Sequence, residues 1–249
     1  MFISIVSDFT LGLLLGWLGG LFGIGGGLLA IPAIVWIFGF SQQLAQGTAL
    51  VMIVPNVIFG FWLYRKHNPV EIKSALLIGL PSVLSTYLTA LYASSLNSHS
   101  LRIAFAGFLV AIAMLLAFQL KPKIEKPSNQ FNLPKWCLGL LGLVSGLFSG
   151  LFTVGGGLVV APTLLKFFNI NRQTAAQGLA LAAVTPGAVV ALSVYATAGH
   201  VDWSVGIPMA LGGVVSMSWG VSLAHKLSEQ LLRAFFSTFL VATAFLLFH

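Results

Sequence analysis

The stretch GWLGGLFGIGGGLLAIP, residues 16–32, decides the fold of this chain. Three consecutive glycines, Gly25, Gly26 and Gly27, interrupt an apolar run that would otherwise suit a membrane helix. Glycine is a poor helix former and adopts positive φ angles that other residues avoid. The stretch therefore predicts two short apolar helices, of about 12–16 residues each, separated by a break at the glycines.

The same stretch recurs in the second half of the chain as GLFSGLFTVGGGLVVAP, residues 146–162. A shift of 130 residues aligns the two stretches, and nine of their 17 positions are identical. A shift of 131 aligns QGTALVMIVP, residues 46–55, with QGLALAAVTP, residues 177–186. Self-similarity at a nearly constant shift along the chain indicates an internal duplication. We therefore divide the chain into a first repeat, 1–120, a basic linker, 121–136, and a second repeat, 137–249.

The composition of the chain indicates that both repeats lie in a lipid bilayer. Hydrophobic residues make up 58% of the 249 residues and charged residues 7%, whereas soluble proteins carry about 25% charged residues. The net charge is +7. The Lys and Arg residues lie in short loops between apolar runs and form no basic stripe, which argues against nucleic-acid binding. The single cysteine, Cys137, excludes an internal disulfide and a cysteine-rich metal site. The N-terminal run has no basic start and no cleavage site, so we interpret it as mature structure.

The apolar runs predict an all-α polytopic membrane protein. Each repeat contributes one glycine-broken segment and three runs that are long enough to cross the bilayer, which takes about 20 residues. The broken segments span 9–40 and 137–168, and the unbroken runs span 46–64, 73–95, 101–119, 174–196, 203–224 and 232–248.

Two topologies are compatible with these segments. If each broken segment crosses the bilayer, the repeats are parallel; if it returns to the same side as a re-entrant hairpin, they are inverted. Lys and Arg concentrate in cytoplasmic loops. With the loop from Arg65 to Lys73 in the cytoplasm, the re-entrant topology places 11 of the 12 Lys and Arg residues inside and only Arg102 outside. The crossing topology divides them seven to five, so we predict inverted repeats with both termini outside the cytoplasm.

The duplicated motif resembles that of the TauE/SafE sulfite exporter family of bacterial permeases. The resemblance rests on GGLFGIGGGLLAIP, residues 19–32, and SGLFTVGGGLVVAP, residues 149–162, and it covers the whole chain. It implies a multi-pass protein of the bacterial inner membrane. It also implies transport of sulfite, a sulfonate or another small sulfur-containing or organic anion, without specifying which.

The glycine triplets are the first candidates for a substrate site. Each precedes a short helix, whose N-terminus offers free N–H groups and a partial positive charge to an anion. Inverted hairpins would bring two such N-termini together near the middle of the bilayer. Buried Gln, Asn and Thr side chains need hydrogen-bond partners, and these partners are either the hairpin backbone or the anion. The candidate substrate-binding residues are Gly25, Gly26, Gly27, Gly155, Gly156, Gly157, Gln46, Gln177, Asn56, Thr153 and Thr185.

Other residues are assigned structural roles. The spacing of Gly12, Gly16 and Gly20 is typical of close packing between membrane helices. The five acidic residues lie near predicted helix ends or in loops, with Glu71 and Asp202 as candidate caps, so no coupling ion follows from them. The sequence contains neither HExxH nor GxSG, and we predict no catalytic residue, metal or cofactor.

The sequence therefore predicts a transporter that binds a small anion at both glycine triplets and moves it by alternating access. An anion channel and a non-catalytic membrane subunit are the alternatives. The small anion and the lipid bilayer are the partners that we expect, and the oligomeric state is not specified.

Overall fold

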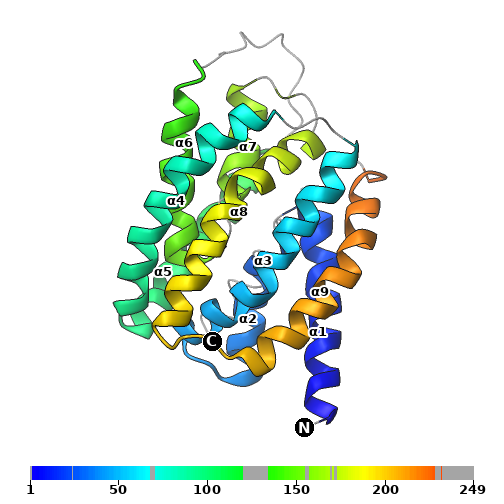
Figure 1. Ribbon diagram of the computed structural model, residues 1–249, viewed down its shortest axis with the longest axis vertical. Helices are drawn as coiled ribbons and strands as arrows, with labels where there is room; N and C mark the ends of the chain where they lie inside the picture. Colours follow the sequence, from blue (N-terminus) through cyan, green and yellow to red (C-terminus); the bar gives the residue numbers. More distant parts are fainter. Residues whose placement is uncertain are drawn as a thin grey trace.

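All regular structure that the computed structural model describes is α-helical (Figure 1). The described residues are 2–23, 25–67, 71–119, 134–154, 157–168, 170, 173–227 and 231. Their helices are α1 (Phe2–Phe22), α2 (Gly27–Phe38), α3 (Gln42–His67), α4 (Ile72–Ser95), α5 (Ser98–Gln119), α6 (Cys137–Phe152), α7 (Gly157–Phe167), α8 (Gln173–Thr197) and α9 (Trp203–Ala224). The predicted helix at 232–248 and most of the predicted linker lie outside the described residues. The all-α prediction is confirmed.

Five of the described helices are long and apolar enough to cross a bilayer, which takes about 20 residues. These segments are Ser4–Phe22, Gln42–Lys66, Ile72–Ser95, Thr174–Thr197 and Trp203–Ala224. Their outer surfaces carry exposed apolar side chains, such as Leu80, Leu84 and Leu88 along one face of α4. Lipid tails are as apolar as leucine, so this exposure has no hydrophobic cost in a bilayer. The chain is a polytopic membrane protein, as predicted.

Each glycine-rich stretch breaks the helical run. α1 ends at Phe22 and α2 begins at Gly27, and α6 ends at Phe152 and α7 begins at Gly157. The lengths of α2, α6 and α7 are 12, 16 and 11 residues, close to those expected. The expected length was wrong for α1, which has 21 residues and begins well before residue 9. Residues 2–8 contain neither proline nor glycine, so no breaker ends the helix there.

The two broken segments enter the molecule from opposite ends in the view of Figure 1. The N-terminus lies at the lower end, where α1 begins, and α3 starts from that end directly after α2. α6 begins at the upper end, and α8, which follows α7, also starts there. The pair α1 and α2 therefore begins and ends at the lower end, and the pair α6 and α7 at the upper end.

α1 packs along α9 through glycines that recur every four residues. A Cβ atom on any of these glycines would collide with the α9 backbone. A hydrogen in place of a side chain allows two helix backbones to approach this closely. The contacts occur at three successive levels: Gly12 with Met209, Gly16 with Gly213, and Gly20 with Met217. The packing role predicted for the three α1 glycines is confirmed.

α6 packs along α4 in the same way. The levels are Gly142 with Ile78, Gly146 with Ser82, and Gly150 with Thr86. Adding 130 to each α1 residue gives the α6 residue, and subtracting 131 from each α9 residue gives the α4 residue. Each half therefore packs its broken segment against the other half. The two interfaces are equivalent, as in a two-fold arrangement of identical subunits.

Candidate functional site

The turn between α1 and α2, residues 22–27, is the first glycine-rich tip. Within it, Gly23, Gly25 and Gly26 have φ angles of 67°, 72° and 87°, in the left-handed region that favours glycine. Gly26 directly precedes α2, and its carbonyl oxygen accepts the N–H of Ala30 at 3.0 Å. The backbone needs glycine here to turn from one helix into the next within a few residues.

Space around the first tip is limited. A Cβ atom on Gly26 would lie 2.9 Å from the carbonyl oxygen of Leu15 in α1 and 2.9 Å from Cε of Met52 in α3. A Cβ atom on Gly27 would press against the side chain of Ile53. The start of α2 is thus enclosed between α1 and α3, and even a methyl group would displace its neighbours.

The turn between α6 and α7, residues 152–157, is the second glycine-rich tip. Gly155 and Gly156 lie outside the described residues, so their role stays a prediction. Thr153 holds the place that Gly23 has in the first repeat, and it adopts a φ angle of 53° although it is not glycine. It is 1% exposed, and its hydroxyl donates to the carbonyl oxygen of the preceding residue at 2.7 Å.

The two tips meet. A Cβ atom on Gly27, the first residue of α2, would lie 3.6 Å from the carbonyl oxygen of Thr153 in the second tip. Reciprocally, a Cβ atom on Gly157, the first residue of α7, would lie 3.9 Å from the carbonyl oxygen of Gly23 in the first tip. The N-termini of α2 and α7 therefore come together inside the molecule, next to the C-terminal ends of α1 and α6.

Gln177 of α8 binds the first tip. Its side-chain nitrogen Nε2 donates to the carbonyl oxygen of Phe22 at 2.9 Å, and the residue is 4% exposed. A Cβ atom on Gly23 would lie 2.7 Å from Cδ of Gln177, so the two residues are in direct contact. The other amide atom, Oε1, has no hydrogen-bond partner among the described residues. Gln177 therefore holds the hairpin backbone and keeps one polar atom free.

Gln46 of α3, its counterpart in the first repeat, forms its hydrogen bond through the amide oxygen, not the amide nitrogen. Its Oε1 accepts the hydroxyl of Tyr195 at 2.7 Å, and its Nε2 has no partner in the described part of the chain. The residue is completely buried. Tyr64, the counterpart of Tyr195, donates to the carbonyl oxygen of Gly20 at 3.0 Å instead. The equivalent glutamines thus leave opposite groups free, a donor on Gln46 and an acceptor on Gln177.

The remaining candidates divide between the site and its surroundings. Asn56 of α3 is completely buried, and its Nδ2 lies 3.4 Å from the carbonyl oxygen of Gly25 in the first tip. Its Oδ1 has no partner among the residues described. Thr185, by contrast, donates to the carbonyl oxygen of Leu181 in its own helix at 2.7 Å and is only half-buried. The described contacts bring Asn56 to the tips and do not bring Thr185 there.

The sequence profile of the sulfite exporter TauE/SafE proteins matches residues 9–247, which include both broken segments and every described spanning helix except the start of α1. The chain belongs to the TauE/SafE sulfite exporter family. The resemblance noted from the two glycine-rich motifs is thereby confirmed.

Relatives of this TauE/SafE chain match along nearly their whole length. The "probable membrane transporter protein MJ0441" of Methanocaldococcus jannaschii is 29% identical over 92% of this chain and 90% of its own. A protein of the same description from Xylella fastidiosa is 26% identical over 97% and 94%. The "probable membrane transporter protein YunE" of Bacillus subtilis is 22% identical over 91% of each chain. No solved structure matches. The family is one of membrane transporters.

Two tyrosines of this TauE/SafE protein were missed as site residues. Tyr64 and Tyr195 are both 0% exposed, and their hydroxyls donate to Gly20, near the end of α1, and to the candidate residue Gln46. Their match between the repeats was a usable signal, because a tyrosine buried in a membrane protein needs a partner for its hydroxyl.

The placement of Asp8 at a helix end was wrong. Because α1 starts at Phe2, Asp8 lies within the membrane-spanning segment Ser4–Phe22, where it is 4% exposed. The hydroxyl of Ser7 lies 3.4 Å from one of its carboxylate oxygens. A carboxylate inside a membrane segment is costly and often functional. The TauE/SafE chain therefore does hold a buried acidic group, toward the lower end of α1.

The two predicted caps differ. Asp202 accepts the backbone N–H groups of Ser204 and Val205 and caps α9 as predicted. Glu71 stands at the N-cap position of α4 but makes no capping bond there. Its carboxylate instead accepts the hydroxyl of Ser74 at 2.7 Å and pairs with Lys135 at 3.0 Å, because both donors lie within reach. These two donors lower the pKa of Glu71.

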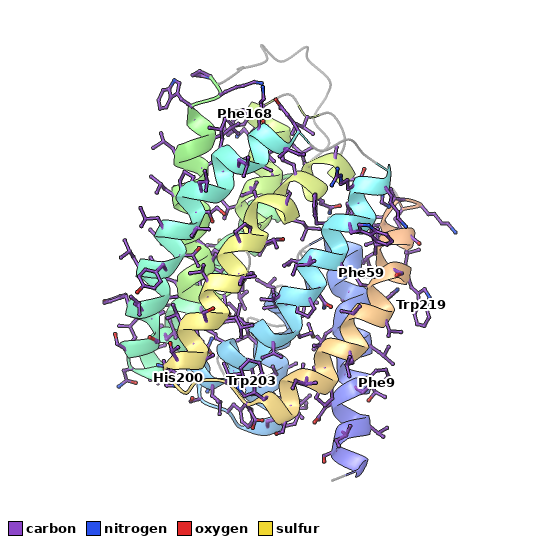
Figure 2. All side chains as sticks on the ribbon, viewed as in Figure 1. Phe9, Phe59, Phe168, His200, Trp203 and Trp219 are labelled. Atoms are coloured by element: carbon purple, nitrogen blue, oxygen red, sulfur yellow. The ribbon has the colours of Figure 1, made fainter. Side chains whose placement is uncertain are left out.

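The pair of Glu71 and Lys135 borders a cavity of about 260 Å³ at the upper end of the molecule. Its walls come from α4, α6, α7 and α8 and include Leu164 and Leu179. Figure 2 places Phe168, which also lines it, at this end. The cavity lies where the second broken segment opens to the surface.

Proposed function

We propose that this protein carries a small oxyanion, such as sulfite or a sulfonate, across the bacterial inner membrane through a site between the two glycine-rich tips. The observation that carries the proposal is the reciprocal meeting of Gly27 with Thr153 and of Gly157 with Gly23. It brings two helix N-termini to one buried place, and each N-terminus is equivalent to about half a positive charge.

The chemistry of this place suits an anion of low charge. Two helix N-termini offset up to about one negative charge without a charged side chain, reduced by the opposite charge of the adjoining C-termini of α1 and α6. Gln46, the counterpart of Gln177 in the first repeat, has a buried amide donor without a partner among the described residues, and by this equivalence we assign it to the same site. Glycine at the start of both helices adds no side chain over the N–H groups. Because the tips are closely packed, an oxyanion would reach these groups when the tips move apart. Thr153 brings a hydroxyl to the second tip.

The ends from which the broken segments enter support two inverted repeats. α1 and α2 open to the lower end of Figure 1, and α6 and α7 to the upper end. The described Lys and Arg residues follow this division, since all but one belong to helix ends at the upper end: Arg65, Lys66, Lys73, Lys135, Lys166 and Lys226. Arg102, near the start of α5, is the exception. By the positive-inside rule the upper end faces the cytoplasm.

The packing of α1 and α6 on the opposite halves supports alternating access. Glycine contacts fix α1 to α9 of the other half and α6 to α4 of the other half. α1 and α6 would therefore move with the opposite half of the chain, whereas the start of α2 packs on Met52 and Ile53 of α3 in its own half. A rocking of the two halves would slide one tip past the other and open the shared site to one side at a time.

A proteoliposome assay tests this proposal. Purified protein is reconstituted, and the uptake of sulfite, sulfate, thiosulfate, taurine, sulfoacetate and short carboxylates is measured one by one. Saturable uptake of at least one oxyanion, absent from empty liposomes, is the expected result. If no member of the panel enters, anion transport is wrong. Flux that rises linearly with concentration would indicate the anion channel instead.

A further inference from the structure

Two buried oxygens at the first tip lack a hydrogen-bond partner among the described residues. They are Oδ1 of Asn56 and Oε1 of Gln177, on residues that are 0% and 4% exposed. Their amide nitrogens face the carbonyl oxygens of Gly25 and Phe22, which fixes which atom of each amide is the oxygen. A buried acceptor without a partner costs about 1–3 kcal/mol. Two such acceptors against one turn could be satisfied by a hydrogen-bond donor or by a cation.

The surroundings of these two oxygens supply further oxygen atoms. The carbonyl oxygens of Gly23 and Thr153 lie where the tips meet, within 4 Å of the Cβ positions of the facing glycines. The C-terminal ends of α1 and α6 also point here, and a helix C-terminus carries a partial negative charge. In transporters with broken helices, such unwound carbonyls and helix C-termini coordinate sodium ions or protons.

The ligand set distinguishes between these ions. Amide and carbonyl oxygens do not titrate near neutral pH, so they cannot carry a transported proton. They are also uncharged, and a buried divalent cation among them would keep an uncompensated charge. A monovalent cation beside a bound anion would be compensated. Oxygen-only coordination by neutral groups therefore fits an alkali cation.

We propose that Asn56 Oδ1 and Gln177 Oε1 form a sodium site at the first tip, which couples the sodium gradient to transport of the anion. The inference rests on the proposed function for the identity of the coupled cargo, but sodium binding itself needs no cargo. The sodium site is supported by the difference between Gln177 and Gln46 in which amide atom lacks a partner. Gln177 has a free acceptor, as a cation requires, and Gln46 has a free donor, as an anion requires.

Binding of ²²Na⁺ to the purified full-length protein, with chloride as the only anion, tests the site without any substrate. The expected result is saturable binding by the wild type, together with a rise in the melting temperature when sodium chloride replaces choline chloride. Asn56→Leu and Gln177→Leu remove one oxygen each and should weaken binding at least about tenfold, or about 1.4 kcal/mol. Asn56→Asp keeps an oxygen at the site and should retain binding.

The matched control is Gln42→Leu. Gln42 is also buried, and both of its amide atoms lack partners among the described residues, but it lies at the start of α3, at the lower end of the molecule. This variant should bind ²²Na⁺ like the wild type. The sodium site is wrong if the wild type shows no saturable binding, or if both leucine variants at the tip bind normally. Anion uptake that proceeds equally in choline would overturn the coupling alone and leave the proposed function standing.

Discussion

Gln177 in α8 donates its side-chain N–H to the carbonyl oxygen of Phe22, the last residue of α1, over 2.9 Å. The two residues are 155 positions apart and belong to different repeats. Their bond fixes the end of one broken segment to a spanning helix of the other half. α1 also packs on α9 of the second repeat. The position of the first tip therefore depends on contacts with both repeats.

Gln177→Leu should therefore impair transport more than it impairs folding. Removing a buried hydrogen bond costs about 1–3 kcal/mol of stability, and the first tip would also lose its fixed position. Gln43→Leu is the matched control, because Gln43 is 5% exposed and its side chain donates to the carbonyl oxygen of Leu96, away from the tips. Both variants should lose similar thermal stability in detergent, and Gln177→Leu alone should lose most of its anion uptake. Equal uptake by the two variants would contradict the role of Gln177.

Gly26→Ala separates backbone strain from loss of the site. Gly26 and Gly39 both have positive φ angles, 87° and 66°, so alanine strains either position by roughly 1–2 kcal/mol. Only at Gly26 does the new methyl group meet atoms, 2.9 Å from the carbonyl oxygen of Leu15, whereas nothing lies within 4 Å at Gly39. We expect Gly26→Ala to abolish uptake and Gly39→Ala to retain it, with both proteins inserted in the membrane. Normal uptake by Gly26→Ala would refute the close fit of the tip.

Gly16→Leu should destabilise the protein by separating α1 from α9. Its side chain would enter the backbone of Gly213, and overpacking of this kind costs about 1–3 kcal/mol or more. Gly146→Leu should do the same at the reciprocal interface with Ser82. Gly107→Leu serves as the control, since nothing lies within 4 Å of a Cβ atom there. The measurement is the melting temperature in detergent; a loss as large for Gly107→Leu would show that the glycine contacts are not responsible.

The orientation in the membrane is testable with single cysteines. In a Cys137→Ser background, Lys66→Cys adds a thiol near the end of α3, and Asn97→Cys adds one between α4 and α5; both positions are exposed. The second lies at the end of the molecule where Figure 2 labels His200, whose ring contacts Ser94. A membrane-impermeant maleimide on intact cells should label Asn97→Cys and reach Lys66→Cys only after lysis. The reverse pattern would invert the topology.

Much of the architecture could be predicted because it depends on local signals. Runs of apolar residues locate the spanning helices, and three consecutive glycines mark the break between α1 and α2, with the last of them beginning α2. The length of α1 was underestimated, because Asp8 suggested a helix end. The structure buries Asp8 inside the helix instead. One polar residue is a weak stop signal compared with proline or glycine.

The site was less predictable because it depends on contacts between the halves. The repeat showed that Gln46 and Gln177 are equivalent, but not that one uses its oxygen on Tyr195 and the other its nitrogen on Phe22. Those bonds join residues about 150 positions apart, and no local pattern records which helix of the other half lies opposite. Asn56 reaches the first tip for the same reason. Thr185 is half-buried and bonds within its own helix.

Counterflow in proteoliposomes tests the central claim most directly. Vesicles with reconstituted protein are loaded with a high concentration of an unlabelled anion found in the uptake panel, and diluted into a trace of the labelled anion. A carrier that alternates around the joined tips should accumulate label transiently above equilibrium, and Gly26→Ala should abolish this overshoot while Gly39→Ala retains it. A monotonic approach to equilibrium in the wild type, or an undiminished overshoot in Gly26→Ala, would contradict alternating access at this site.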